Sequence, residues 1–210
     1  MTNLPDEYLK ALGPDLGEIY QRLCDDVSWL HLKWKQYRTL FVESQERIDL
    51  LNRVGGTFFF IIQEVLHDDV LMHIARLVDR KKHKDKENLS LLQLASTVQA
   101  KAPKISGEIY HLVGEARKKG QFVDDWRNRR LAHTSLDVAL GRKAKELPGI
   151  ELKQIEGFLR ALRDALNRIP NHFWQNGGNS FQNIYAERDA EDLVSWLKRA
   201  VDAKKRDFNL

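Results

Sequence analysis

The fold is decided first by residues 16–41, LGEIYQRLCDDVSWLHLKWKQYRTLF, in which large apolar side chains return every three or four positions. That interval matches the turn of an α-helix, so these side chains lie on one stripe. The stripe is formed by Tyr20, Leu23, Val27, Leu30, Trp34, Tyr37 and Phe41. Charged residues such as Asp25 and Lys35 occupy the opposite face. The segment therefore predicts a long amphipathic helix with one buried side.

A second long helix is predicted over residues 43–78, directly after the first. Apolar residues again recur at helical spacing, and we expect them to form its buried side. These residues are Ile48, Leu51, Val54, Phe58, Ile62, Val65, Ile74 and Leu77. Gly55 and Gly56 interrupt the pattern. Because glycine is a poor helix former, the pair indicates a local bend or a close contact between helices.

The remainder of the chain predicts shorter helices separated by loops. The basic run at residues 80–86 has no apolar residue and is expected to be a connecting loop. We expect Asn88 or Ser90 to cap the next helix, Gly120 to follow the end of another, and Pro170 to end or kink a third. The last helix is expected to bury Leu193, Trp196, Leu197, Ala200 and Val201. The expected helices cover about residues 89–101, 104–119, 121–133, 151–169 and 186–205.

These patterns predict an all-α protein built around a bundle of six to eight helices, of which the two N-terminal ones are long. The chain has 210 residues, of which 42% are hydrophobic, so it can build one good core or at most two small ones. We expect a single helical domain over residues 1–210, with the motif core at about 16–140 and C-terminal helices at about 150–207.

The sequence also argues against several classes of protein. Its longest apolar run, residues 57–62, is far shorter than the roughly 20 residues that cross a membrane. Residues 1–6 lack the basic and apolar pattern of a secretory signal. Cys24 is the single cysteine, which excludes an internal disulfide and a cysteine-based zinc site. A reducing, cytoplasmic location without membrane contact is therefore expected.

Positive charge is concentrated in four short segments, although the net charge of the chain is a mild +4. Taken singly, each segment is typical of a solvated loop or of a helix end, where cations suit the helix dipole. If several of them converge in space, they would attract a polyanion such as RNA. The four segments are residues 80–86, 117–119, 127–130 and 204–206.

The segment that carries chemistry is WRNRRLAH, residues 126–133, in which an arginine is followed by a polar residue and, a few positions later, by a histidine. This arrangement resembles the signature of the HEPN superfamily. Upstream, QEVLHDDVL at 63–71, RLVD at 76–79 and ENLS at 87–90 resemble the abortive-infection, AbiU-like branch of that superfamily. The resemblance covers roughly residues 20–140.

The resemblance implies a long antiparallel helical bundle that commonly forms dimers, and a metal-independent endoribonuclease that needs no cofactor. It makes Arg127 and His133 the catalytic pair and Asn128 a supporting polar residue. The expected RNA contacts are the surrounding cations Arg129, Arg130, Lys118 and Lys119. The expected partners are RNA and a second copy of the chain, with an antitoxin protein as a further candidate, in a phage-defence or toxin–antitoxin setting.

The chemistry of these residue types agrees with that expectation. Cleaving RNA without a metal requires deprotonation of the 2′-hydroxyl and protonation of the leaving oxygen, and a histidine near neutral pKa can serve either step. A guanidinium can stabilise the charge that develops on the phosphoryl oxygens. Positions six apart lie about 120° apart around an α-helix, however, so Arg127 and His133 do not share one face. Either the helix ends or distorts before His133, or both side chains reach a cleft from its two sides. We expect a symmetric dimer, in which two motif helices face each other across a two-fold axis and pool two arginines and two histidines.

Other interpretations stay open at this stage. Arg127 could pair with Asp124 or Glu115, and His133 could be an interior histidine. The chain could then be a HEPN module that binds RNA or protein without cleavage, or a helical adaptor. His67, Asp68, Asp69 and His73 invite a metal site, but their spacing on a helix favours a polar patch. Cys24 lies on the buried side of the first helix and is expected to belong to the core.

Overall fold

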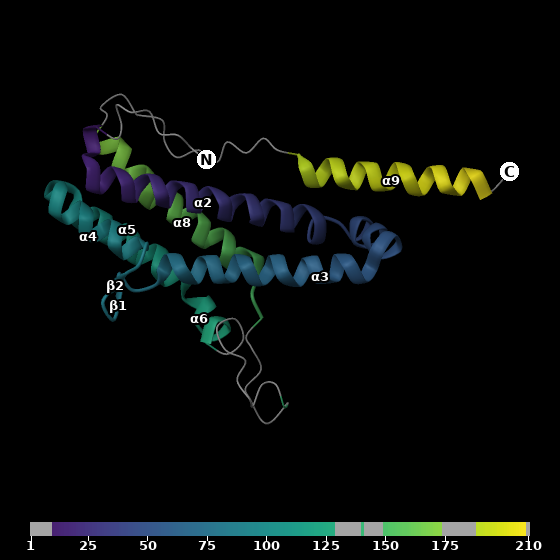
Figure 1. Ribbon diagram of the computed structural model, residues 1–210, viewed down its shortest axis with the longest axis horizontal. Coiled ribbons are helices and arrows are strands. Elements are labelled where there is room, and N and C mark those ends of the chain that lie inside the picture. Colours follow the sequence, from purple (N-terminus) through teal and green to yellow (C-terminus); the bar gives the residue numbers. More distant parts are fainter. Residues whose placement is uncertain (1–9, 129–139, 141–148, 174–187, 209–210) are drawn as a thin grey trace. The chain divides into compact units, whose positions relative to one another are not determined.

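The computed structural model describes residues 10–128, 140, 149–173 and 188–208, and within these ranges the chain is all-α (Figure 1). Seven α-helices lie in the described part, which confirms the predicted class and number. In chain order the elements are α2 (Pro14–Phe41), α3 (Gln45–Val78), β1 (Lys82–His83), β2 (Lys86–Glu87), α4 (Leu91–Lys101), α5 (Pro103–Gly120), the 3-10 turn η1 (Gln121–Val123), α6 (Asp124–Trp126), α8 (Leu152–Phe173) and α9 (Asp189–Phe208).

The basic run at residues 80–86 was predicted to be a connecting loop, and this was wrong, because part of it pairs as two short strands. It forms a short antiparallel hairpin in which Lys82 pairs with Glu87 and His83 pairs with Lys86. At its tip Lys84 adopts a φ of 54°, the left-handed conformation that a tight turn needs. Asn88 closes the base, because its side-chain amide donates to the Arg80 carbonyl at 2.9 Å.

Two compact units make up the chain. The first comprises residues 1–29 and 71–183, and the second comprises residues 30–70 and 184–210. Because α2 and α3 pass from one unit to the other, each long helix contributes to both cores. The expectation of a single domain over residues 1–210 stays a prediction.

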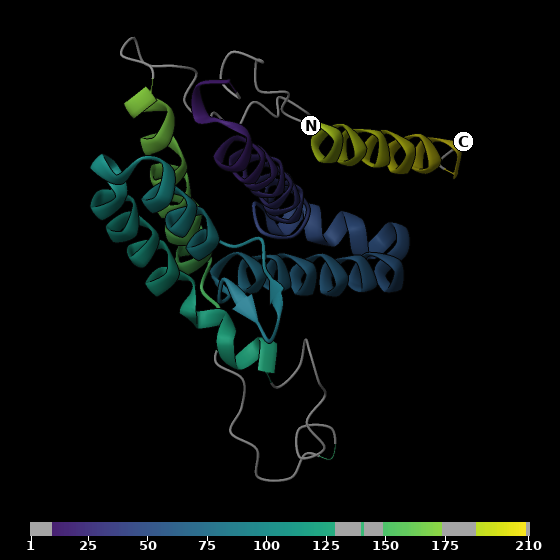
Figure 2. The same cartoon turned by 60° about the vertical axis from the view of Figure 1, so that its left-hand side comes forward.

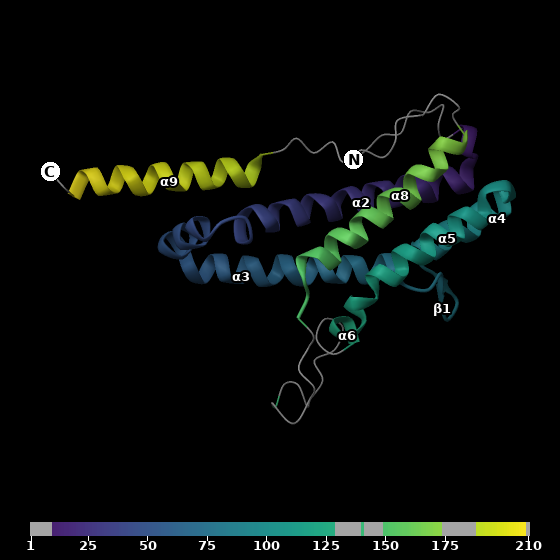
Figure 3. The ribbon, with the colours of Figure 1, turned by 180° about the vertical axis from the view of Figure 1, so that it is seen from behind.

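In the first unit, α5 packs against α4 and α8 (Figures 2 and 3). The predicted stripe of the first helix is confirmed here, because Tyr20, Leu23 and Val27 are buried. Ser90 begins α4 as its N-cap and accepts a hydrogen bond from the Gln93 amide at 3.4 Å. The largest buried side chains of this core are Leu16, Tyr20, Leu23, Leu71, Ile74, Leu77, Leu91, Leu94, Ile109 and Phe158.

Gly120 has a steric role instead of the predicted role of a glycine just beyond a helix end. It is the last residue of α5 and keeps a right-handed helical conformation. A Cβ at this position would lie 2.7 Å from Cγ1 of Val78 and 3.1 Å from the ring of Phe158. Glycine is therefore required because the ends of α3 and α5 and the first half of α8 approach each other closely here.

Pro170 does not end its helix, which continues to Phe173. Proline lacks an amide hydrogen, so the carbonyl four residues earlier, at Leu166, loses its helical donor. The hydroxyl of Tyr20 on α2 donates to this same carbonyl at 3.3 Å, in a buried position. A hydrogen bond between helices thus replaces the one that the proline removes, and α8 continues with its backbone satisfied.

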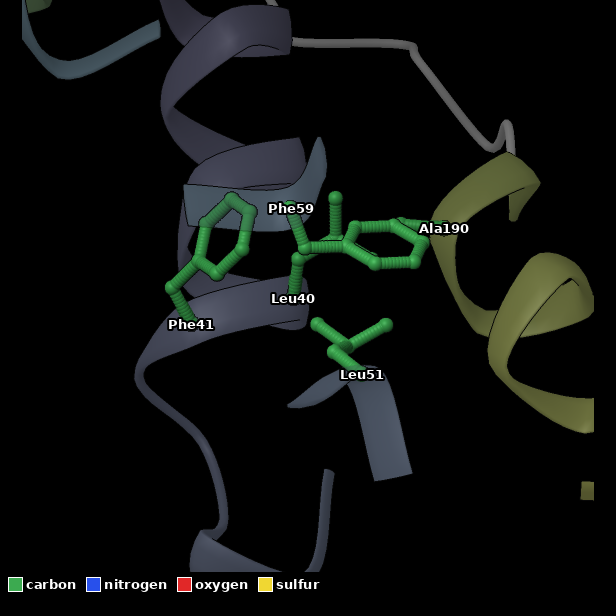
Figure 4. Packing of buried hydrophobic residues seen from close by; sticks show 5 residues of the cluster. All are labelled: Leu40, Phe41, Leu51, Phe59 and Ala190. Atoms are coloured by element: carbon green, nitrogen blue, oxygen red, sulfur yellow. The ribbon is translucent and has the colours of Figure 1, made fainter. Parts of the chain in front are cut away.

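The second unit has its own apolar core, formed where the end of α2, the first part of α3 and the start of α9 meet (Figure 4). Gly55 interrupts α3 with a non-helical φ of −171° and ψ of 61°, which confirms the predicted bend. The bend lies between Leu51 and Phe59, and both of these face the same core. The buried members of this core are Leu40, Phe41, Leu51, Phe59 and Ala190.

Part of the predicted buried side of α3 is exposed. The exposed fractions are 43% for Val54, 61% for Phe58 and 60% for Val65. Trp196 and Ala200 on α9, also expected to be buried, are exposed as well. Nearly every face of this part of α3 is apolar, so periodicity could not tell which face Leu51 and Phe59 would turn toward the core.

None of the described helices combines the length and the apolar character that a membrane crossing requires.

We predict that Tyr20→Phe lowers the free energy of unfolding by about 1–3 kcal/mol, because it leaves the buried Leu166 carbonyl without a donor. Urea denaturation followed by circular dichroism measures this loss. The matched control is Tyr110→Phe, whose hydroxyl donates to Gln99 at an exposed position. Equal losses in the two variants would contradict the role given to Tyr20.

We also predict that Gly120→Ala destabilises the protein by about 1–3 kcal/mol, because its methyl group overlaps the Val78 side chain. Gly114, on the same helix, has no heavy atom within 4 Å of an added Cβ. Gly114→Ala should therefore stabilise the protein by about 0.5–1 kcal/mol through helix propensity alone. Thermal or urea unfolding of both variants measures whether the two changes in stability have opposite signs. A Gly120→Ala variant more stable than the parent protein would refute the packing explanation.

Candidate functional site

A polar hollow of about 250 Å³ lies in the first unit, where the end of α3 meets the end of α5 and the start of α6. Figure 2 shows α6 directly after α5, at the lower end of this unit. Three arginines and two aspartates line the hollow, so positive charge prevails there. The lining residues are Val78, Asp79, Arg80, Arg117, Gln121, Asp124, Arg127 and Asn128.

Arg127 lies where the helical winding changes. Its backbone amide donates to the Asp124 carbonyl in a tight turn, and the chain then takes the wider π form at Arg127 and Asn128. Interruptions of this kind are frequent at functional sites, because they re-aim side chains that a regular helix would direct elsewhere. The change fits the expectation that the motif helix distorts before His133, which lies outside the described residues.

The guanidinium of Arg127 is held by two neighbours. Nε donates to Oδ1 of Asn128 at 3.2 Å, and Nη1 lies 3.5 Å from Oδ1 of Asp79. One third of the side chain, 33%, remains exposed, so an anion can reach it. Arginine has five N–H donors, and these two contacts leave others available for a bidentate bond to phosphate.

Asp79 anchors the hollow at the end of α3. Its Oδ1 accepts the backbone amide of Arg80 at 2.8 Å as well as facing Arg127. The amide bond fixes the carboxylate relative to the chain that leaves α3. Asp79 therefore presents a carboxylate, fixed at the end of α3, as the ion-pair partner of the Arg127 guanidinium.

Arg117 joins the two helix ends that border the hollow. Its Nε donates to the carbonyl of Val78 at 3.0 Å, across from α5 to the last residue of α3. This carbonyl is one of the four that a helix C-terminus leaves without an intrahelical partner. A cationic donor suits that position because the helix dipole is negative there. The contact holds Arg117 at the wall of the hollow, beside Arg127.

The predicted site residues divide into three groups. Arg127 and Asn128 line the hollow and touch each other. Lys118 and Lys119 are exposed on the last turn of α5 but do not line it. His133, Arg129 and Arg130 fall outside the described residues, so the pairing of Arg127 with His133 stays a prediction.

Sequence reasoning did not assign Asp79, Arg80 or Arg117 to the site. Arg80 and Arg117 do belong to two of the basic segments that were expected to attract RNA if they converged, and the hollow brings both beside Arg127. Neither Asp124 nor Glu115, the partners considered for Arg127, is its ion-pair partner among the described residues, and Asp79 takes that place. A signal for it was present, because RLVD at residues 76–79, part of the family-like stretch, ends on this aspartate. Nothing local indicated that the end of α3 would meet the motif.

The histidines of α3 lie in different surroundings. His67 belongs to the second unit, where its ring lies 5.8 Å from that of Tyr37. His73 belongs to the first unit, is buried, and places Nε2 3.8 Å from the carboxylate of Asp26. Within the described ranges, no group of three potential metal ligands gathers. His73 is buried, so the two histidines do not share one exposed polar patch.

Cys24 belongs to the core, as predicted. Burial raises the pKa of its thiol to about 12. The thiol is therefore protonated at neutral pH, and because the thiolate is the reactive form of cysteine, Cys24 is not a nucleophile.

The chain matches the model of a known protein family. A model of the HEPN family AbiU2 matches residues 13–193, which is most of the chain and includes the hollow. No curated protein and no solved structure matches.

We predict that Arg117→Met lowers the free energy of unfolding by about 1–3 kcal/mol, because the Val78 carbonyl loses a charged donor at a partly buried position. Lys118→Met is the matched control, since this neighbour is exposed and should change stability by less than about 0.5 kcal/mol. Urea denaturation of both variants tests the difference. A loss in Lys118→Met as large as that in Arg117→Met would remove the case for this contact.

Proposed function

The chain belongs to the AbiU2 family of HEPN-domain proteins, and on that premise we propose that it is a metal-independent endoribonuclease acting in phage defence or as a toxin with an antitoxin. The observation that carries the proposal is the Arg127 guanidinium, held by Asp79 and Asn128 at the edge of a hollow in which arginines prevail. Such a hollow favours a phosphodiester group, because guanidinium groups bind phosphate oxygens in pairs.

In the proposed reaction the 2′-oxygen of the substrate attacks the adjacent phosphorus. The bond from phosphorus to the 5′-oxygen of the next nucleotide then breaks, which leaves a 2′,3′-cyclic phosphate and a free 5′-hydroxyl. Charge accumulates on the non-bridging oxygens during this step. Arg127 stabilises that charge, because it is already oriented by Asp79 and need not reorganise as the reaction proceeds.

His133 is proposed to move the protons in this reaction. It takes the proton of the 2′-hydroxyl or gives one to the leaving 5′-oxygen, and imidazole suits either role near neutral pH. Asn128 supports Arg127 through the hydrogen bond from Nε. The other of these two proton transfers is carried out by water or by His133 of a second copy. We therefore propose a homodimer in which two motifs share one site.

RNA binding is proposed to follow the positive charge around the motif. Arg80 and Arg117 line the hollow itself, and Lys118 and Lys119 extend the charge along the surface of α5. Arg129 and Arg130 follow Arg127 in the sequence. Phosphate contacts of this kind make binding depend strongly on salt without fixing a base sequence.

The test is cleavage of a labelled single-stranded RNA by the purified protein in EDTA. We predict that Arg127→Ala and His133→Ala each reduce the cleavage rate by at least about a hundredfold, because each removes a group that acts in the transition state. The product should carry a 2′,3′-cyclic phosphate, which mass spectrometry identifies.

Matched controls separate catalysis from folding. Arg22→Ala and His111→Ala remove the same residue types from exposed positions on α2 and α5 and should cleave normally. All four variants should keep the circular dichroism of the parent protein. Cleavage that survives in both Arg127→Ala and His133→Ala would refute the catalytic assignment. Salt-sensitive RNA binding without any cleavage would instead make the chain a HEPN binding module.

A further inference from the structure

A groove of about 610 Å³ lies in the second unit, between the first part of α3 and the second half of α9. Its lining combines apolar residues with cations, and among the described residues no carboxylate lines it. The apolar members are Val54, Leu197, Ala200 and Val201, and the cations are Arg53, Lys204 and Lys205.

The groove exists because α9 is covered on one half and open on the other. Near its start, Ala190 is buried and Leu193 and Val194 pack against the core of the second unit. Further along, Leu197, Ala200, Val201 and Lys204 follow at steps of three, one and three, so they share one face of the helix. Leu197 is partly buried against that core, and Val201 is half-buried, whereas Ala200 and Lys204 on the same face are exposed.

The cations of the groove are available to a ligand. Arg53 and Lys204 have no ion-pair partner within the described ranges, and the nearest carboxylate to Lys205 is Asp202, at 4.0 Å on its own helix. In the adjoining hollow of about 630 Å³, by contrast, Glu43 faces Arg47 at 2.6 Å and Glu46 faces Lys198 at 2.8 Å. Arg53 and Lys205 also line that hollow, beside Asp49 and Asp202, whereas Lys204 lines only the groove. The positive charge without an ion pair among the described residues is therefore that of Lys204 and, on the α3 side, of Arg53.

An apolar floor between cations complements one kind of occupant in particular. A helix with leucine-like residues on one face and carboxylates on its flanks would bury its apolar face and place its charges against the cations. Single-stranded RNA fits less well, since it is held by aromatic stacking as well as by charge, and none of the described residues that line the groove is aromatic.

We propose that this groove is the docking surface for an acidic amphipathic helix of a partner protein. The occupant lies along Leu197 and Val201, with its carboxylates toward Arg53 and Lys204. The proposal stands apart from the ribonuclease assignment, because the groove and the Arg127 hollow belong to different units and share no residue.

The experiment is fluorescence anisotropy with the whole chain and a fluorescein-labelled peptide designed as an amphipathic helix, with leucine on one face and glutamate on both flanks. A scrambled peptide of the same composition and a labelled single-stranded RNA are the comparison probes. We expect the amphipathic peptide to bind, the scrambled one to bind at least about tenfold more weakly, and added salt to weaken the binding.

The decisive variant is Arg53→Glu with Lys204→Glu, which should weaken peptide binding by at least about tenfold through charge repulsion. Arg199→Glu with Arg206→Glu is the matched control, because it changes the net charge equally on exposed positions of α9 that do not line the groove. The control should bind the peptide like the parent chain. Circular dichroism shows whether both double variants keep their helices.

The anisotropy experiment can overturn the proposal in four ways. The first two are that the amphipathic peptide does not bind, or that the scrambled peptide binds as tightly. The third is that the control variant weakens peptide binding as much as Arg53→Glu with Lys204→Glu does. The fourth is that Arg53→Glu with Lys204→Glu abolishes RNA binding while peptide binding persists. Self-association that the same double variant abolishes, seen by sedimentation without peptide, would assign the groove to a second copy and would also overturn it. RNA cleavage by the parent chain is measured separately and should be unchanged in the double variant.

Discussion

The packing of the first unit and the geometry of its candidate site both depend on the C-terminal end of α3. The side chain of Val78 fills the space that Gly120 leaves free, and the Val78 carbonyl accepts a hydrogen bond from Arg117. The next residue, Asp79, holds Arg127. Packing, helix termination and the candidate site thus meet within two consecutive residues, so a displacement of this helix end would alter all three together.

Two backbone carbonyls that lack a helical partner are satisfied by side chains from other helices. Pro170 removes the donor to the Leu166 carbonyl, and Tyr20 supplies one from another helix. Arg117 does the same for Val78 at the end of α3. Since a buried polar group without a partner is costly, these contacts fix which helices meet and at what height along their axes. The orientation of Arg127 is a further result of that alignment.

Much of the architecture could be predicted from the sequence. The spacing of the apolar residues in α2 gave the helix and its buried side, because covered positions such as Tyr20 and Val27 alternate with charged ones. In α3 the same method gave the helix and its bend but not its buried side. Val54 and Phe58 are as apolar as Leu51 and Phe59, yet they face solvent, since apolar periodicity reports a preference and not the presence of a neighbour.

Residues that are close together along the chain were enough to predict the helical class, the long helices, the interruption of α3 at Gly55 and the local motif with Arg127 and Asn128, and several separate stretches carried the resemblance to the AbiU-like family. The packing of the helices brings Asp79 and Arg117 to Arg127 and forms the basic groove beside α9, and neither arrangement could be predicted from these patterns. Asp79 is far from Arg127 in the sequence, and the α3 and α9 residues of the groove are also far apart. The end of α3 is placed against α5 by the way Val78 and Phe158 pack around Gly120, which no local pattern contains.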